Sequence, residues 1–145
     1  MNPQNRKTVA DTVSNGAVGS RNEVEMQFDT QVNFHGMHYC MSIEPENTDA
    51  NANGFWVVLC LPGNILAAGD LPDTFSKLQN DNIQPYIWGM GCWTASNQAP
   101  FHAEFAPRTS RTCKKDARIF AYVCITGQSA GNTRINQTLT GFTSL

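Results

Sequence analysis

The sequence predicts an all-β fold, a single antiparallel β-sandwich with one short helix. Three observations lead to this prediction. Apolar and polar residues alternate over a long stretch after residue 22, several short apolar runs are separated by turn-forming residues, and only one segment has helical spacing. A chain of 145 residues is one ordinary domain, able to bury a core without metal or disulfide support.

The first 22 residues differ in composition from the rest of the chain. Met1–Asn22 is polar and rich in Gly, Ser and Asn, and it shows neither the period of a strand nor that of a helix. Such a segment has little apolar surface to bury on ordering. We therefore expect a flexible N-terminal arm over residues 1–22 and a folded domain over residues 23–145.

The longest alternation runs from Glu23 to Phe34. Its period of two predicts one strand with one face in solvent. Gly36 permits a bend or bulge, after which His38–Ile43 is expected to form another strand. Glu44–Gly54 (EPENTDANANG) is dense in turn-forming residues and predicts an exposed loop.

The remaining elements are one helix and five strands. Phe55–Leu61 (FWVVLCL) is a short apolar run between Gly54 and Pro62, which predicts a strand buried on both faces. Leu71–Leu78 is the helix candidate, with Asp70 as its cap. The other expected strands are Tyr86–Ala95, Phe101–Phe105, Arg118–Thr126 and Ile135–Phe142. The residues expected between the two sheets are Val24, Met26, Phe28, Val57, Leu59, Leu61, Ile87, Phe105, Ile119, Ala121 and Val123.

The surface is expected to be polar but weakly charged. Charged residues make up 15% of the chain, and 43 Asn, Gln, Ser and Thr residues outnumber the 22 charged ones. Such a surface suits wet protein–protein contacts, and a net charge of −2 argues against generic nucleic-acid binding. The first 22 residues contain no apolar signal-peptide core, and no apolar run is long enough to cross a bilayer, so we expect a soluble chain with no membrane partner.

Neither metal binding nor catalysis is expected. His35-Gly-Met-His38-Tyr-Cys40 contains suitable ligands, but the repeated pair spacing of structural zinc sites is missing, and only His102 and Cys92 offer further attractive donors. On a regular strand His38 and Cys40 share a face, with His35 on the other. The five cysteines are odd in number and irregularly spaced, so free and mostly buried thiols are expected. We therefore predict no catalytic residues, no metal site and no cofactor.

One stretch is basic. Half of the ten Lys and Arg residues lie in the eleven positions from Arg108 to Arg118. These five cations could neutralise phosphates, which makes them the candidate nucleic-acid contacts: Arg108, Arg111, Lys114, Lys115 and Arg118. The alternative is a solvated edge or loop whose charges deter strand pairing.

Two stretches resemble the jelly-roll coat proteins of small icosahedral viruses. They are Tyr86–Thr94 (YIWGMGCWT) and, after an alternating strand, Arg108–Phe120 (RTSRTCKKDARIF). In that family a phrase of the form Thr-Ser-Arg-Asn-Leu-x-x-Gly-Asp-x-Ile often precedes the penultimate strand, as a turn that leads into a buried strand. Here Cys113 replaces the apolar residue and Lys115 the glycine. The polar first segment also fits, because coat-protein arms commonly thread between subunits, although it lacks a dense Arg/Lys tract.

The resemblance implies a jelly-roll shell domain and a structural role. Many copies would self-assemble into an icosahedral capsid around a viral genome, with other capsid proteins as further partners and nucleic acid bound through the basic stretch. The particle would be a virion assembled in the host cell cytoplasm. The alternative is a trimeric TNF-like or lectin-like binding module on a virion surface, with Asn136–Leu145 as its central strand.

Overall fold

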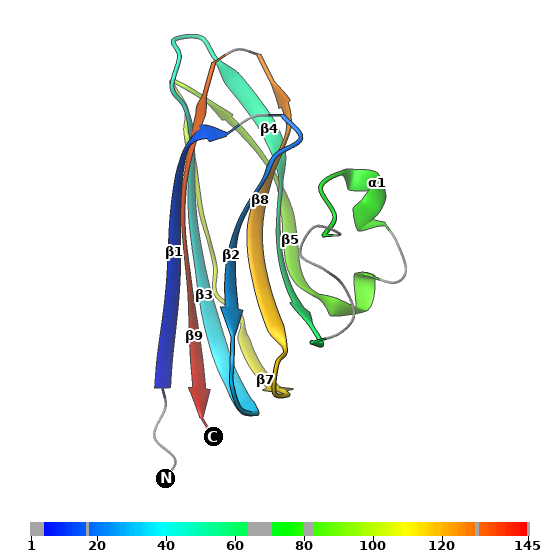
Figure 1. Ribbon diagram of the computed structural model, residues 1–145. Helices are drawn as coiled ribbons and strands as arrows, with labels where there is room; N and C mark the ends of the chain where they lie inside the picture. The colour runs from blue at the N-terminus through cyan, green and yellow to red at the C-terminus, as the bar shows by residue number, and fades with distance from the viewer. Residues whose placement is uncertain (1–4, 17, 64–70, 80–82, 130, 145) are drawn as a thin grey trace.

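The protein is an antiparallel β-sandwich of two sheets, as expected from the sequence (Figure 1). The computed structural model describes residues 5–16, 18–63, 71–79, 83–129 and 131–144. These residues form nine strands: β1 (Asn5–Gly16), β2 (Arg21–Gln27), β3 (Val32–Pro45), β4 (Asn51–Leu61), β5 (Ile87–Ser96), β6 (Phe101–Phe105), β7 (Arg108–Cys113), β8 (Arg118–Gln128) and β9 (Thr133–Ser144).

Each sheet combines strands that are distant in the sequence. Sheet A has the order β1-β9-β3-β6, with β7 also paired to β3, and sheet B has the order β2-β8-β4-β5. All seven strand pairings are antiparallel. The connection from β2 to β3 and the connection from β7 to β8 lie at the same end of the sandwich, where β1 also begins (Figure 1).

The segment expected to be a flexible arm is largely a strand. Asn5–Gly16 pairs with β9 along its length, from Asn5 opposite Thr143 to Gly16 opposite Thr133, and β2 already begins at Arg21. The polar composition is compatible with a strand here because β1 is at the edge of sheet A. Its order comes from backbone hydrogen bonds to β9, and Val9 is a partly buried contact to the core. Met1–Gln4 lies outside the described residues.

The long alternation from Glu23 to Phe34 is two strands in different sheets. The chain leaves sheet B after Gln27 and enters sheet A at Val32. The backbone carbonyl of Phe28 accepts a hydrogen bond from the Asp116 amide, 3.2 Å, which holds this turn against the β7–β8 turn. The strand expected after Gly36 is a continuation of β3, and Gly36 itself lies at a bulge.

The loop after β3 and the helix have different bounds from those expected from the sequence. The loop expected over Glu44–Gly54 is shorter, because β3 extends to Pro45 and β4 begins at Asn51. Helix α1 spans only Phe75–Leu78 and begins after Thr74, whose hydroxyl accepts a hydrogen bond from the Lys77 amide, 3.2 Å. Asp70, the expected cap, lies outside the described residues. A short 3₁₀ helix, η2 (Gln84–Tyr86), precedes β5. Among the described residues, no helix is long and apolar enough to span a membrane.

The described residues form two apolar clusters, one on each face of sheet B. The inter-sheet cluster contains six of the expected core residues: Val24, Met26, Phe28, Ile119, Ala121 and Val123. Phe105 is partly buried against it. The outer cluster lies under α1 and contains Val57, Leu59 and Leu61, with Ile87 against it, so these four residues do not pack between the sheets as expected (Figure 1). The expectation that Phe55–Leu61 is buried on both faces is confirmed.

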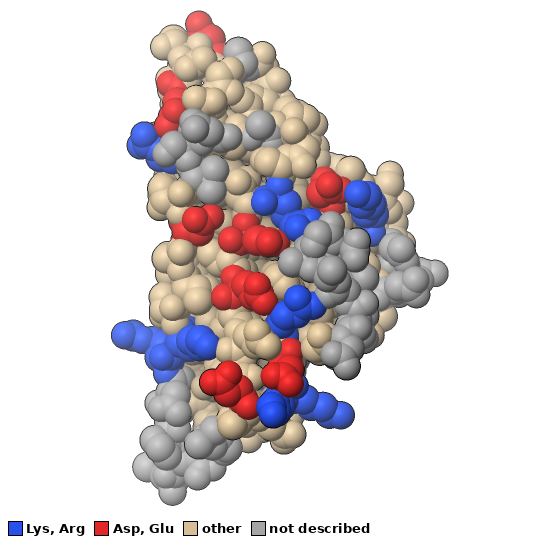
Figure 2. All heavy atoms as spheres, in the orientation of Figure 1, with Lys and Arg blue, Asp and Glu red and all other residues tan. Residues whose placement is uncertain are grey.

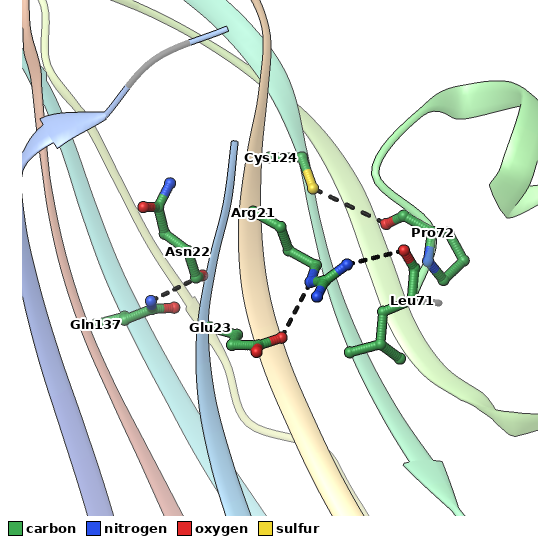
Figure 3. A network of polar contacts seen from close by, with 7 residues as sticks. All are labelled: Arg21, Asn22, Glu23, Leu71, Pro72, Cys124 and Gln137. Atoms are coloured by element: carbon green, nitrogen blue, oxygen red, sulfur yellow. Dashed lines mark hydrogen bonds and ion pairs between the residues drawn. The ribbon is translucent and has the colours of Figure 1, made fainter. Parts of the chain in front are cut away.

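A network of polar contacts connects the two sheets to each other and sheet B to the segment before α1 (Figure 3). Arg21 donates from Nε to Glu23 Oε2 and from Nη1 to the Leu71 carbonyl, both at 3.0 Å, which connects β2 to the segment before α1. Gln137 of sheet A donates from Nε2 to the Asn22 carbonyl of sheet B, 2.9 Å, and accepts a hydrogen bond from the Tyr39 hydroxyl, 2.7 Å. Gln137 therefore satisfies two buried polar groups and fixes the two sheets relative to each other.

Candidate nucleic-acid interface

The five predicted cations are gathered at one end of the sandwich, which we call the basic end. Arg108 and Arg111 belong to β7, Lys114 and Lys115 to the turn that follows, and Arg118 is the first residue of β8. The segment expected as an edge or loop is thus partly a strand, paired with the first residues of β3.

The turn of the basic end is tightly built. Asp116 has a positive φ of 67°, in the left-handed region that Asp tolerates better than most residues. The Ala117 amide donates to the Lys114 carbonyl, 3.1 Å, and the Asp116 amide donates to Phe28, so backbone hydrogen bonds fix the position of the turn. Lys114 and Lys115 are both exposed on it, so the turn presents two adjacent positive charges to solvent.

The cations do not share one face. Arg111 is on the same side of β7 as the buried Cys113, and its guanidinium lies over the Trp88 ring, 5.1 Å from the centroid. Arg108 lines a different hollow together with His35, His38 and Phe142 on the outer side of sheet A. Arg118 lies over Phe120, 5.3 Å from the ring centroid, on the outer side of sheet B. The charges therefore surround the end of the sandwich.

An aromatic hollow of about 350 Å³ adjoins Arg111. Tyr86 and Trp88 line it together with Arg111 and Lys114, so two aromatic rings and two cations face one space. Aromatic side chains beside cations are the elements with which proteins stack bases and neutralise the adjacent phosphates. Tyr86 and Trp88 are the residues that sequence reasoning missed, because they reach this end from η2 and β5.

Two thiols also line the same hollow. Cys60 Sγ of β4 and Cys113 Sγ of β7 are 3.8 Å apart, and both residues line the hollow. The hydrogen bond from the Cys60 thiol and the nearby Arg111 guanidinium lower the pKa of Cys113, while the same hydrogen bond and burial raise the pKa of Cys60. Cys113 is therefore the more readily ionised thiol of the pair.

The positive potential at the basic end is modest. Within the segment from Arg108 to Arg118, Asp116 is the only acidic residue that offsets the five cations. On the face shown in Figure 2, Lys and Arg side chains near this end are interspersed with Asp and Glu, and most of the surface carries no charge. The arrangement can hold a few phosphates, and its affinity should fall steeply with salt.

The histidine and cysteine residues considered as metal ligands lie outside the aromatic hollow. The bulge at Gly36 changes the alternation of β3, so His35 is exposed and lines the same outer hollow as His38, contrary to the expectation for a regular strand. His35 Nε2 is 2.6 Å from Ser144 Oγ. Cys92 is exposed on β5 in sheet B, whereas His38 and Cys40 are in sheet A. Of the five thiols, Cys113 and Cys124 are buried and all are free.

These features define a two-sheet antiparallel β-sandwich protein with a small cationic and aromatic site at one end. Compared with models of known protein families and with curated proteins, the chain matches none.

Proposed function

We propose that the protein is a jelly-roll shell protein, many copies of which assemble into a closed viral particle. The observation that carries the proposal is the order of strand pairing. β6 and β7 pair with successive parts of β3 and are separated by two residues, so they count as one interrupted strand. Eight strands then pair in a nested way: first with last (β1·β9), second with seventh (β2·β8), third with sixth (β3·β6/β7), and fourth with fifth (β4·β5).

Nested pairing is what a long hairpin gives when it is rolled into two sheets. The two resulting four-stranded sheets are the arrangement of jelly rolls, which viral capsid and lectin domains share. Because one fold serves several functions, the shell role needs support beyond the fold. The resemblance of β5 and of the β7–β8 segment to coat proteins provides one such support.

The outer side of sheet A provides another. Six neighbouring outward positions of β1 and β9 are small and uncharged: Thr8, Ala10, Thr12, Asn136, Thr138 and Thr140. Contact between copies at these six positions would bury no charged side chain, and their hydroxyl and amide groups can hydrogen-bond across an interface. In the proposed particle the basic end faces the interior, where its cations contact the genome.

Particle formation is the direct test. Purified protein is examined by light scattering and negative-stain microscopy over a range of salt and pH. Closed particles of many copies support the shell. Trimers under every condition would refute it in favour of the TNF-like or lectin-like module, and a monomer at every concentration would refute both. The module's expected central strand is β9, which lies between β1 and β3 within sheet A, so its backbone edges are already paired.

The role of the basic end is tested separately in the particles. Replacing Arg108, Arg111 and Lys114 by Gln should lower the nucleic-acid content, measured by absorbance after nuclease treatment, with the circular-dichroism spectrum unchanged. The virion would be assembled in the host cell cytoplasm, with this chain alone or together with other capsid proteins. Unchanged nucleic-acid content in the variant particles would refute the assignment of the cations.

A further inference from the structure

Three potential metal ligands meet on the outer side of sheet A. His38 and Cys40 are two residues apart on β3, so their side chains leave the strand on the same side. Glu104 of β6 is the direct antiparallel partner of Cys40. Strand pairing thus brings Glu104 next to two donors that precede it by 64 and 66 residues in the chain.

The donor atoms are already close. Cys40 Sγ is 3.4 Å from His38 Nε2, His38 Nε2 is 3.4 Å from Glu104 Oε2, and Cys40 Sγ is 3.8 Å from Glu104 Oε1. In tetrahedral zinc sites, with Zn–S of about 2.3 Å and Zn–N or Zn–O of about 2.0–2.1 Å, donors lie about 3.3–3.6 Å from one another. One ion could therefore contact all three residues after only small side-chain rotations.

The residue types select the metal. A thiolate, an imidazole and a carboxylate suit a borderline ion such as Zn²⁺ better than Mg²⁺ or Ca²⁺, which prefer oxygen donors alone. With Cys40 and Glu104 ionised, the triad carries two negative charges. The adjoining hollow is lined by Cys40, His102 and Glu104 together with uncharged residues, and among the described residues that line it there is no Lys or Arg. No cation of that hollow therefore competes for the two anionic donors, and Arg108 lines the separate hollow on the other side of His38.

We propose that His38, Cys40 and Glu104 form a Zn²⁺ site with three protein ligands and an open fourth position. The side chains of His38 and Glu104 are 39% and 69% exposed, so the fourth position is accessible. Water, or a donor from another molecule that contacts this face, would complete the tetrahedron. The site goes beyond the proposed shell function and does not depend on it.

Cobalt substitution tests the site on the full-length protein. Chelator-treated protein, kept reduced with a phosphine, is titrated with Co²⁺ and, in parallel, with Zn²⁺ by calorimetry. The wild-type chain should bind one equivalent of either ion and show the sulfur-to-cobalt charge-transfer band together with the visible bands of four-coordinate cobalt. Cys40→Ser should remove the charge-transfer band. Changing a residue that only hydrogen-bonds to a metal ligand typically weakens metal binding about 10- to 100-fold. Replacing a ligand itself, as in Cys40→Ser or Glu104→Gln, should therefore weaken Zn²⁺ binding at least 100-fold.

Cys92→Ser is the matched control, because Cys92 is an exposed thiol on the other sheet. It should leave the spectrum and the affinity unchanged. Circular dichroism establishes that each variant is folded before titration. Absence of one-equivalent binding in the folded wild type would overturn the proposal, as would an unchanged cobalt spectrum in Cys40→Ser. Particle formation is scored separately, so failure of the metal site and failure of the shell function are distinguishable.

Discussion

Replacing Tyr39 by Phe and Gln137 by Leu, singly and together, measures how much one buried polar connection stabilises the sandwich. Tyr39 is fully buried and Gln137 is 3% exposed. Gln137 accepts from the Tyr39 hydroxyl at 2.7 Å and donates to the Asn22 carbonyl of the other sheet at 2.9 Å. Each single substitution therefore leaves at least one buried polar group without this partner.

The expected magnitudes follow from the number of groups left unpaired. Tyr39→Phe leaves Gln137 Oε1 without its donor, which costs about 1–3 kcal/mol. Gln137→Leu affects both the Tyr39 hydroxyl and the Asn22 carbonyl, so the free energy of unfolding should fall by about 2–5 kcal/mol. That is a large part of the ~5–15 kcal/mol that stabilises an ordinary domain. In the Gln137→Leu background, Tyr39→Phe removes an already unpaired hydroxyl and should be neutral or stabilising.

The assay is urea unfolding of unassembled subunits followed by circular dichroism, with the four proteins forming a double-mutant cycle. The coupling energy should exceed about 1 kcal/mol, well above the ~0.3–0.5 kcal/mol error of additivity. Thr140→Ala is the control, because the Thr8–Thr140 hydroxyl contact, 3.1 Å, is exposed and its loss should cost little. Additive effects of Tyr39→Phe and Gln137→Leu would refute the inference that one connection links the sheets.

Three further predictions concern the core and the thiols. Gly54→Ala should destabilise by ~3 kcal/mol or more, because the new Cβ would lie 1.8 Å from the Cys124 carbonyl oxygen, whereas in Gly36→Ala the nearest atom is 3.5 Å away and thermal unfolding should change little. Burial raises the pKa of Cys124 to about 12, so the folded state favours the protonated thiol. This contribution to the free energy of unfolding is fully present below the unfolded-state pKa of about 8.5 and is lost as the pH rises toward 12. Wild type should therefore lose more stability than Cys124→Ala in urea titrations at alkaline pH, and parallel curves would contradict this. The thiol oxidant diamide should form a disulfide between Cys60 and Cys113, and it is itself reduced to its hydrazine by taking up the hydrogens of the two thiols. Mass spectrometry would detect the disulfide as a linked peptide. A disulfide to Cys92 in its place would show the pairing to be wrong.

The sandwich could be predicted from the sequence because the apolar residues of several strands directly reflect which of their faces are buried. Phe55–Leu61 lacks polar residues since apolar clusters cover both faces of β4, and the structure confirms this. Alternation was less informative at Phe28. The chain changes sheets there, but Phe28 and Val32 are both buried and remain in phase, so a period of two continues through the turn. The strand β1 was missed because an edge strand can be ordered by backbone pairing with few apolar side chains.

The sites were harder to predict because they depend on register. Sequence position grouped the five cations, but β7 directs Arg108 and Arg111 to different sides, and Trp88 reaches Arg111 from another sheet. Likewise, nothing near His38 indicates Glu104 as a neighbour, since their proximity follows from the pairing of β3 with β6. A bulge of one residue at Gly36 was sufficient to place His35 on the opposite side from the expected one.

The cations of the basic end point in different directions, so we expect them to have different roles. Measuring how nucleic-acid binding depends on salt can distinguish these roles. Lys114 and Lys115 are exposed on the turn, whereas Arg111 also packs over Trp88. Replacing both lysines by Gln should leave stability unchanged and reduce the slope of log affinity against log salt for a single-stranded oligonucleotide by about 1.4, since each phosphate contact contributes about 0.7. Arg111→Gln should reduce the slope by about half as much and also lower the unfolding free energy by about 0.5–1 kcal/mol, because the cation–π contact is lost. Fluorescence anisotropy measures the slope. An unchanged slope in the double lysine variant would mean that the turn does not contact phosphate, and the cations would then be a solvated end of the sandwich.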